Sequence, residues 1–63
     1  MNPTRGIITL AIQVVRSNGY KYEYSRGDHD YFFKEKRRII ISNSLNRMVW
    51  ECVEKEFELD LNV

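Results

Sequence analysis

The sequence predicts a small α+β domain in which a central set of β-strands is followed by a helix. Tyrosines alternate with polar residues over residues 20–25, and the β-branched run IIIS follows at residues 39–42. Over residues 45–57 the apolar side chains recur instead at the three- and four-residue spacing of a helix. Because a strand repeats every two residues and a helix about every 3.6, one chain is expected to contain both.

The length of the chain limits it to one domain, residues 1–63. A chain this short buries only about 60% of its unfolded surface, so we expect its stability to be small. The apolar fraction of 43% and the aromatic fraction of 13% are ordinary for a globular protein and argue against disorder.

Cysteine usage and hydropathy predict a cytoplasmic protein with no membrane association. Cys52 is the only cysteine, which excludes an internal disulfide and fits a reducing compartment. The longest apolar run, IITLAI at residues 7–12, is far too short to span a bilayer. The N-terminal residues lack the charged segment, apolar region and cleavage site of a signal peptide.

The first segment has two interpretations, and the first of them is a helix. Asn2 can cap a helix, and Pro3 is preset for its first turn. Asn18 and Gly19 would end it, since glycine is the usual residue just past a helix. The expected apolar stripe consists of Ile7, Ile8, Ala11, Val14 and Val15.

The second interpretation of the same segment is a strand. Ile8, Leu10, Ile12 and Val14 alternate with other residues, and the segment is rich in β-branched side chains. Residues 17–19 would then form a hairpin loop. Local pattern alone leaves the helix and the strand about equal.

The middle of the chain predicts strands joined by tight turns. Residues 20–25 form the first clear strand, and residues 26–28 have the composition of a turn. A second strand starts with the three aromatics at 31–33. Residues 34–37 make a short polar turn, and residues 38–42 form the last strand.

The C-terminal segment predicts a final helix that Ser42, Asn43 or Ser44 caps. Its expected buried stripe consists of Leu45, Met48, Val49, Cys52, Val53 and Phe57. Trp50 lies off this stripe, so we expect it to be partly exposed and available to a partner or to the sheet edge. Cys52 lies on the stripe and is expected to be inert core.

The charge is distributed unevenly although the net charge is only +1. Residues 1–38 hold eight basic and four acidic side chains, a balance of +4. Residues 39–63 hold two basic and five acidic side chains, a balance of −3. A basic half that also carries tyrosines can follow a phosphate backbone, although a solvated surface with an acidic last helix explains the same charges.

His29 is the only histidine, and it follows the predicted turn directly. Histidine is the side chain that exchanges a proton near neutral pH, so His29 is a candidate general acid or base. Asp28 and Asp30 can stabilise its charged form, or they can simply form the turn. Neither a second histidine nor a nearby cysteine accompanies it, so no metal site is expected. The plain alternative is a surface turn residue.

The densest basic run follows His29 by one strand and consists of Lys34, Lys36, Arg37 and Arg38. We expect this run to lie close to His29 across a hairpin, where it would suit phosphate binding. A solvated turn is the alternative. Three alternating tyrosines on a strand are likewise either a packed sheet face or a surface on which bases stack.

These residues together resemble the HicA toxins of HicA–HicB toxin–antitoxin systems. The likeness lies in a first helix closed by Asn18, Gly19 and Tyr20, then a strand, then residues 26–29 (RGDH) and an aromatic strand. The ten-residue step from Gly19 to His29 is the usual spacing of that family. The resemblance implies an α-β-β-β-α fold, with a three-stranded antiparallel sheet and two helices on one face, like a double-stranded-RNA-binding domain. It therefore favours the helix for the first segment.

The same resemblance implies a function. HicA toxins cleave mRNA without a metal or another cofactor, and the residue matching their histidine is His29. A HicB-like antitoxin protein would cover that histidine, and its gene would lie next to this one. The implied RNA-binding residues are Lys21, Arg26, Lys34, Lys36, Arg37 and Arg38. Tyr20 and Tyr22 are the expected base-stacking residues.

An alternative function comes from another class of protein. The chain has IIISNS at residues 39–44, where the family commonly carries a valine–proline segment and a second histidine. It is also closer to neutral than many family members. The alternative is a small phage or plasmid protein without catalytic activity that binds RNA or presents an edge strand and Trp50 to a host protein.

Overall fold

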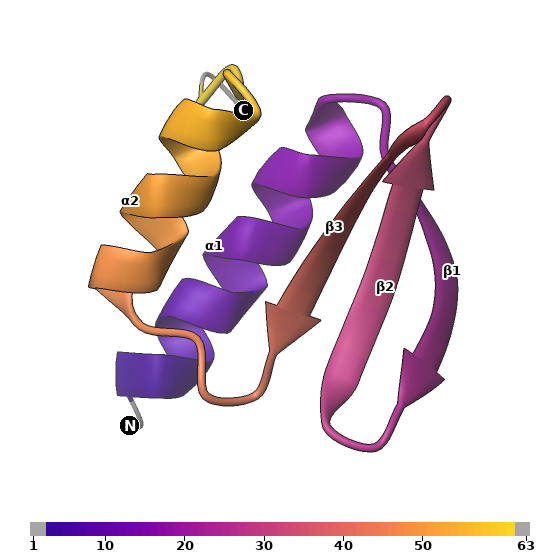
Figure 1. Cartoon of the computed structure of the whole chain (residues 1–63). Coiled ribbons are helices and arrows are strands. Elements are labelled where there is room, and N and C mark those ends of the chain that lie inside the picture. The colour runs from indigo at the N-terminus through magenta and orange to yellow at the C-terminus, as the bar shows by residue number, and fades with distance from the viewer. Residues whose placement is uncertain (1–2, 62–63) are drawn as a thin grey trace.

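The computed structural model describes residues 3–61, with a helix, three strands and a second helix in that order (Figure 1). The elements are α1 (Pro3–Ser17), β1 (Lys21–Arg26), β2 (His29–Lys34), β3 (Arg37–Ser42) and α2 (Arg47–Glu56). This order confirms the predicted α+β class and the α-β-β-β-α arrangement, and it fits the topology of a double-stranded-RNA-binding domain. The expected cap Asn2 lies outside the described residues.

The first segment is a helix, so the strand interpretation of it is wrong. Of the predicted apolar stripe, four residues are buried and Ile8 is half-buried; the buried four are Ile7, Ala11, Val14 and Val15. Gly19 follows the helix with a φ of +92°, a conformation that glycine adopts without steric cost. The Tyr20 N–H bonds back to the Val15 carbonyl at 3.2 Å, and this contact closes the helix end.

The three strands form one antiparallel sheet in the order β1-β2-β3. Phe32 pairs with Ile39, and both are buried beneath the helices together with Ile41. The two helices lie on the same face of the sheet, while the opposite face has no helix over it (Figure 1). Successive side chains of a strand alternate between the two faces of the sheet. Each strand residue therefore points either to the side that the helices cover, the helix side, or to the uncovered side, the open side.

Both hairpin loops contain two residues. Gly27 and Asp28 join β1 to β2, and Gly27 has the positive φ of +63° that a tight hairpin of type II′ requires at its first loop position. Glu35 and Lys36 join β2 to β3. Strand β2 therefore starts at His29, two residues earlier than predicted.

Helix α2 begins later than predicted, and another residue caps it. The Asn46 side chain accepts a hydrogen bond from the Val49 N–H at 2.9 Å, which makes Asn46 the N-cap. The prediction that Ser42, Asn43 or Ser44 caps this helix is wrong. Because the helix starts at Arg47, Leu45 belongs to the preceding loop, although it is buried.

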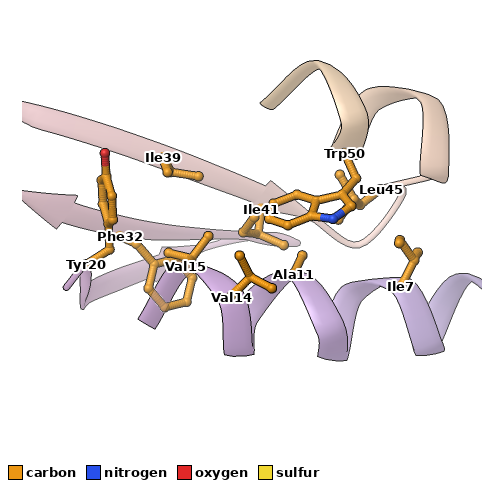
Figure 2. Close-up of a cluster of buried hydrophobic side chains, with 10 residues drawn as sticks. All are labelled: Ile7, Ala11, Val14, Val15, Tyr20, Phe32, Ile39, Ile41, Leu45 and Trp50. Carbon is orange, nitrogen blue, oxygen red and sulfur yellow. The ribbon is translucent and has the colours of Figure 1, made fainter. Parts of the chain in front are cut away.

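The predicted buried stripe of α2 is rotated relative to the real one. Trp50 is only 2% exposed, whereas Met48 is 76% exposed. Val49 and Cys52 are also exposed, so the expectations of a partly exposed Trp50 and a buried Cys52 are both wrong. Figure 2 shows the Trp50 indole directed from α2 into the core beside Ile41. Burying one large indole removes more apolar area from water than burying either Met48 or Cys52 in its place would.

The hydrophobic core lies between the sheet and the two helices (Figure 2). Its buried members are Ile7, Ala11, Val14, Val15, Tyr20, Phe32, Ile39, Ile41, Leu45 and Trp50. Ten buried side chains among residues 6–61 form a small core, so each of them carries a large share of the free energy of folding.

The Asn18 side chain forms hydrogen bonds that connect the segment after α2 to the end of α1. Its side-chain Nδ2 donates to the carbonyls of Val14 and Asp60, at 2.8 Å each, and its Oδ1 accepts from the Asp60 N–H at 2.8 Å. An aspartate or an alanine at this position would lose both donated bonds. The asparagine thus has a structural role beyond ending the helix.

Replacing Asn18 with alanine is expected to lower the free energy of unfolding by about 1–2 kcal/mol, because three partly exposed hydrogen bonds are lost. Urea denaturation followed by circular dichroism measures the change. Ser17→Ala is the matched control, since Ser17 is exposed and adjacent. Equal stability of the two variants would show that Asn18 does not hold the C-terminal segment.

Candidate functional site

The candidate site lies on the face of the sheet that the helices leave uncovered, which we call the open face. In an antiparallel sheet, directly paired residues point to the same side. The register therefore places three rows of side chains across the open face. They are a first row of Lys21, Phe33 and Arg38, a middle row of Tyr24, Tyr31 and Ile40, and a third row of Arg26, His29 and Ser42.

A β-bulge in β1 separates the alternating tyrosines onto opposite faces. The register shifts between Tyr22 and Tyr24, so Tyr22 pairs with buried Phe32 while Tyr24 pairs with Tyr31. The Tyr22 and Phe32 rings meet edge to face with their centroids 5.8 Å apart. The Tyr24 and Tyr31 rings stack with centroids 4.6 Å apart and planes 9° from parallel. Simple alternation would have placed Tyr22 and Tyr24 together.

The two tyrosines expected to stack on bases lie elsewhere. Tyr20 is 4% exposed and packs edge to face against Phe57, so a base cannot reach its ring and this prediction is wrong. Tyr22 is exposed but lies on the helix side, where its hydroxyl is 2.6 Å from the Ser25 hydroxyl. The exposed rings of the open face are those of Tyr24 and Phe33, whereas the predicted base-stacking residues are Tyr20 and Tyr22.

His29 is the first residue of β2 and stands on the open face. Its side chain is 46% exposed, and its Nδ1 atom lies 3.4 Å from the Asp28 Oδ1 atom. Arg26 is its partner in β1, and Ser42 is its partner in β3. A carboxylate beside one ring nitrogen orients an imidazole and leaves the other nitrogen directed elsewhere.

Asp30, the other carboxylate expected near His29, points to the helix side of the sheet. It pairs with Ile41 in β3 and accepts a hydrogen bond from the Ser25 hydroxyl at 2.6 Å. Of the two candidate aspartates, therefore, only Asp28 lies against the imidazole. Asp30 instead forms a hydrogen bond that links β2 to β1 within the hairpin.

The basic run does not lie next to His29. His29 begins β2 and Lys34 ends it, and five steps of about 3.3 Å separate them by roughly 16 Å. Figure 1 shows the two hairpin turns at opposite ends of the sheet. The prediction that this run approaches His29 across a hairpin is therefore wrong. Arg26, on the neighbouring strand, is the cation beside the histidine.

Two members of the basic run have partners within the chain. The Lys34 ammonium donates to the Asn18 carbonyl at 2.8 Å and lies 5.7 Å from the centre of the Tyr20 ring. The Arg38 guanidinium lies 3.1 Å from a Glu23 carboxylate oxygen. These contacts give both side chains structural roles.

The remaining candidate RNA-binding side chains are exposed and form no ion pair among the side chains of residues 6–61; they are Lys21, Arg26, Lys36 and Arg37. Lys36 and Arg37 border a shallow hollow of about 380 Å³ that also reaches Phe33 on the open face. Arg26 is at the histidine end of the sheet, and Lys21 is beside Phe33.

Comparison of the chain with protein-family models, with curated proteins and with solved structures gives no match. Neither described helix has the length and the apolar character needed to cross a membrane. Over residues 3–61, no three histidine, cysteine, aspartate or glutamate side chains gather as metal ligands.

The third row of the open face contains two groups that can take part in the cleavage of a phosphodiester, the His29 imidazole and the Arg26 guanidinium. An imidazole supplies a group that accepts or donates a proton, and a guanidinium beside it can bind a phosphate oxygen. Arg26 and His29 are directly paired residues, whose β-carbons lie about 5 Å apart in such a sheet. One phosphate can contact both side chains at that separation.

Proposed function

We propose that this protein is a HicA-like toxin, a metal-independent endoribonuclease that cleaves mRNA with His29 as its acid–base residue. The observation that carries the proposal is the His29 imidazole, which is 46% exposed, lies against the Asp28 carboxylate and is paired across the sheet with Arg26. The α-β-β-β-α order and the Gly19–His29 spacing also support it.

The reaction uses a nucleophile that RNA itself carries. His29 takes the proton from a ribose 2′-hydroxyl, the 2′-oxygen attacks the adjacent phosphorus, and the bond from phosphorus to the 5′-oxygen breaks. The proton passes to that leaving oxygen, which leaves a 2′,3′-cyclic phosphate and a 5′-hydroxyl. Arg26 binds the phosphate and stabilises the charge that develops on it.

A HicB-like antitoxin is the partner that this function requires. Such a protein would neutralise the toxin by covering His29, which is accessible on the open face. The gene next to this one is then expected to encode it.

The test is cleavage of a single-stranded RNA by the purified protein in the presence of EDTA. We expect cleavage, with products that end in a cyclic phosphate, because the proposed chemistry needs no metal ion. An oligonucleotide with 2′-deoxyribose at the cleaved position should remain intact, because it lacks the nucleophile. Gel electrophoresis and mass spectrometry of the products measure both results.

Cleavage of the 2′-deoxy substrate, or loss of cleavage in EDTA, would contradict this mechanism. RNA binding without any cleavage would instead favour the RNA-binding module named above. The host-protein inhibitor loses one of its two supporting features, because Trp50 is buried.

A further inference from the structure

The middle of the open face carries apolar side chains that no part of the described chain covers. Tyr24 is 40% exposed, Phe33 is 38% exposed and Ile40 is 47% exposed. They belong to three different strands and occupy adjacent rows. Together with Tyr31, they form what we call the aromatic platform: Tyr24, Tyr31, Phe33 and Ile40.

The two exposed rings are available for stacking in different ways. Tyr31 covers one face of the Tyr24 ring, and the parallel orientation of the two rings directs the other face of Tyr24 away from the stack. Tyr24 lies in β1, an edge strand, so no further strand lies beyond that second face, and 40% of the residue is exposed. Within residues 6–61, the Phe33 ring makes no contact with another aromatic ring. Both rings can therefore accept a planar partner.

Cations border the platform on both sides. Lys21 and Arg38 flank Phe33 in the first row, and Arg26 stands in the third row beside His29. The hollow next to Phe33 is lined by Lys36, Arg37 and Arg38 and also by Glu23 and Glu35, and Glu23 is the carboxylate that pairs with Arg38. Aromatic rings between basic side chains match a ligand with planar bases and a charged backbone.

We propose that the aromatic platform binds single-stranded RNA, with bases stacked on Tyr24 and Phe33 and the backbone held by Lys21 and Arg26. This inference rests on the proposed ribonuclease function and names the form of its substrate. A paired base in a duplex offers no free ring face to a side chain, whereas an unpaired base does. The platform therefore selects unpaired RNA and leads its backbone towards His29.

The test measures binding of a fluorescent single-stranded RNA with 2′-O-methyl groups, which cannot be cleaved. Tyr24→Ala and Phe33→Ala are each expected to weaken binding about 5- to 150-fold, the range for loss of one stacked base. Met48→Ala is the matched control, because Met48 is an exposed apolar residue on α2, away from the platform. Its affinity should equal that of the wild type.

A charge variant tests the same platform without removing a ring. Lys21→Gln is expected to reduce the slope of log affinity against log salt by about 0.7, the value for one lost phosphate contact to a single strand. Circular dichroism of each variant should match the wild type, since these side chains lie outside the core. A duplex of the same sequence should bind at least about 5-fold more weakly than the single strand, the smallest effect expected for one lost stacked base.

The outcomes separate this proposal from the proposed function. If Tyr24→Ala and Phe33→Ala bind and cleave like the wild type, the platform is wrong although the ribonuclease stands. If binding depends on both rings but nothing is cleaved, the platform stands and the ribonuclease is wrong. Equal binding of duplex and single strand would overturn the platform. The platform proposal would also be wrong if Tyr24→Ala and Phe33→Ala lost binding to a protein partner but bound RNA like the wild type. The platform would then be a protein interface.

Discussion

Replacing His29 with alanine is expected to slow RNA cleavage about 10²–10⁴-fold, the usual contribution of one general acid or base. That factor corresponds to about 3–5 kcal/mol of activation free energy. The expected loss follows from the structure, because Asp28 lies against the imidazole and Arg26 is paired with it, and neither supplies a second imidazole in its place. Initial rates on one oligonucleotide, measured for both proteins, give the ratio.

The His29 experiment needs a control at the same end of the sheet. Asn43→Ala serves this purpose, because its backbone N–H bonds to the Asp28 carbonyl at 2.9 Å while its side chain is exposed. We expect it to cleave at the wild-type rate. His29→Ala should also keep the thermal midpoint and the RNA affinity of the wild type. If it cleaves as fast as the wild type, His29 is not the acid–base residue.

Replacing Trp50 with alanine is expected to remove most of the stability of the domain. A buried tryptophan that is truncated to alanine costs about 3–5 kcal/mol, and Trp50 is among the largest fully buried side chains. A domain of this size has only about 3–9 kcal/mol of unfolding free energy, at 0.05–0.15 kcal/mol per residue. The thermal midpoint should therefore fall by about 15 °C or more. Circular dichroism during heating measures it.

Met48→Ala is the matched control for Trp50, because it lies two residues earlier on the same helix and is exposed. An exposed substitution of this kind changes stability by less than about 0.5 kcal/mol. A Trp50→Ala protein that melts within a few degrees of the Met48→Ala protein would contradict the packing described here.

Several elements could be predicted from local pattern because the local signals and the tertiary contacts agree. In α1 the apolar stripe that includes Val14 and Val15 is the face that packs on the sheet, and Gly19 ends the helix as its lack of a side chain allows. The β1–β2 turn follows from Gly27 for the same reason. In these places one residue type satisfies both the local backbone and the fold.

Helix α2 shows where a pattern of apolar residues is not enough. Met48, Val49 and Cys52 continue a plausible stripe, but the core between α1 and the sheet has room for an indole, and Trp50 fills it. Counting apolar positions treats Cys52 and Trp50 as equivalent. The apolar area that Trp50 can bury is much larger than that of Cys52. The cap at Asn46 could not be chosen over its neighbours either, since several residues of the same kind precede the helix.

The candidate site was predictable only in part, because its geometry depends on pairing between strands. His29 stood out as a lone histidine after a turn. The distance from His29 to the basic run depends on where β2 begins, and the open face depends on which residue of β1 is unpaired. Neither quantity can be read from composition, so the sequence predicts base stacking at Tyr20 and does not point to Tyr24 and Phe33.

The bulge in β1 identifies the residue of this strand whose loss the sheet can best tolerate. Tyr22 pairs with Phe32 and Tyr24 pairs with Tyr31, so Glu23 is the one residue of β1 without a partner in β2. Deleting Glu23 would let Lys21, Tyr22 and Tyr24 alternate without an irregularity, and each would keep its side of the sheet. Loss of this one codon is thus expected to preserve the strand pairing, although it removes the ion pair between Glu23 and Arg38.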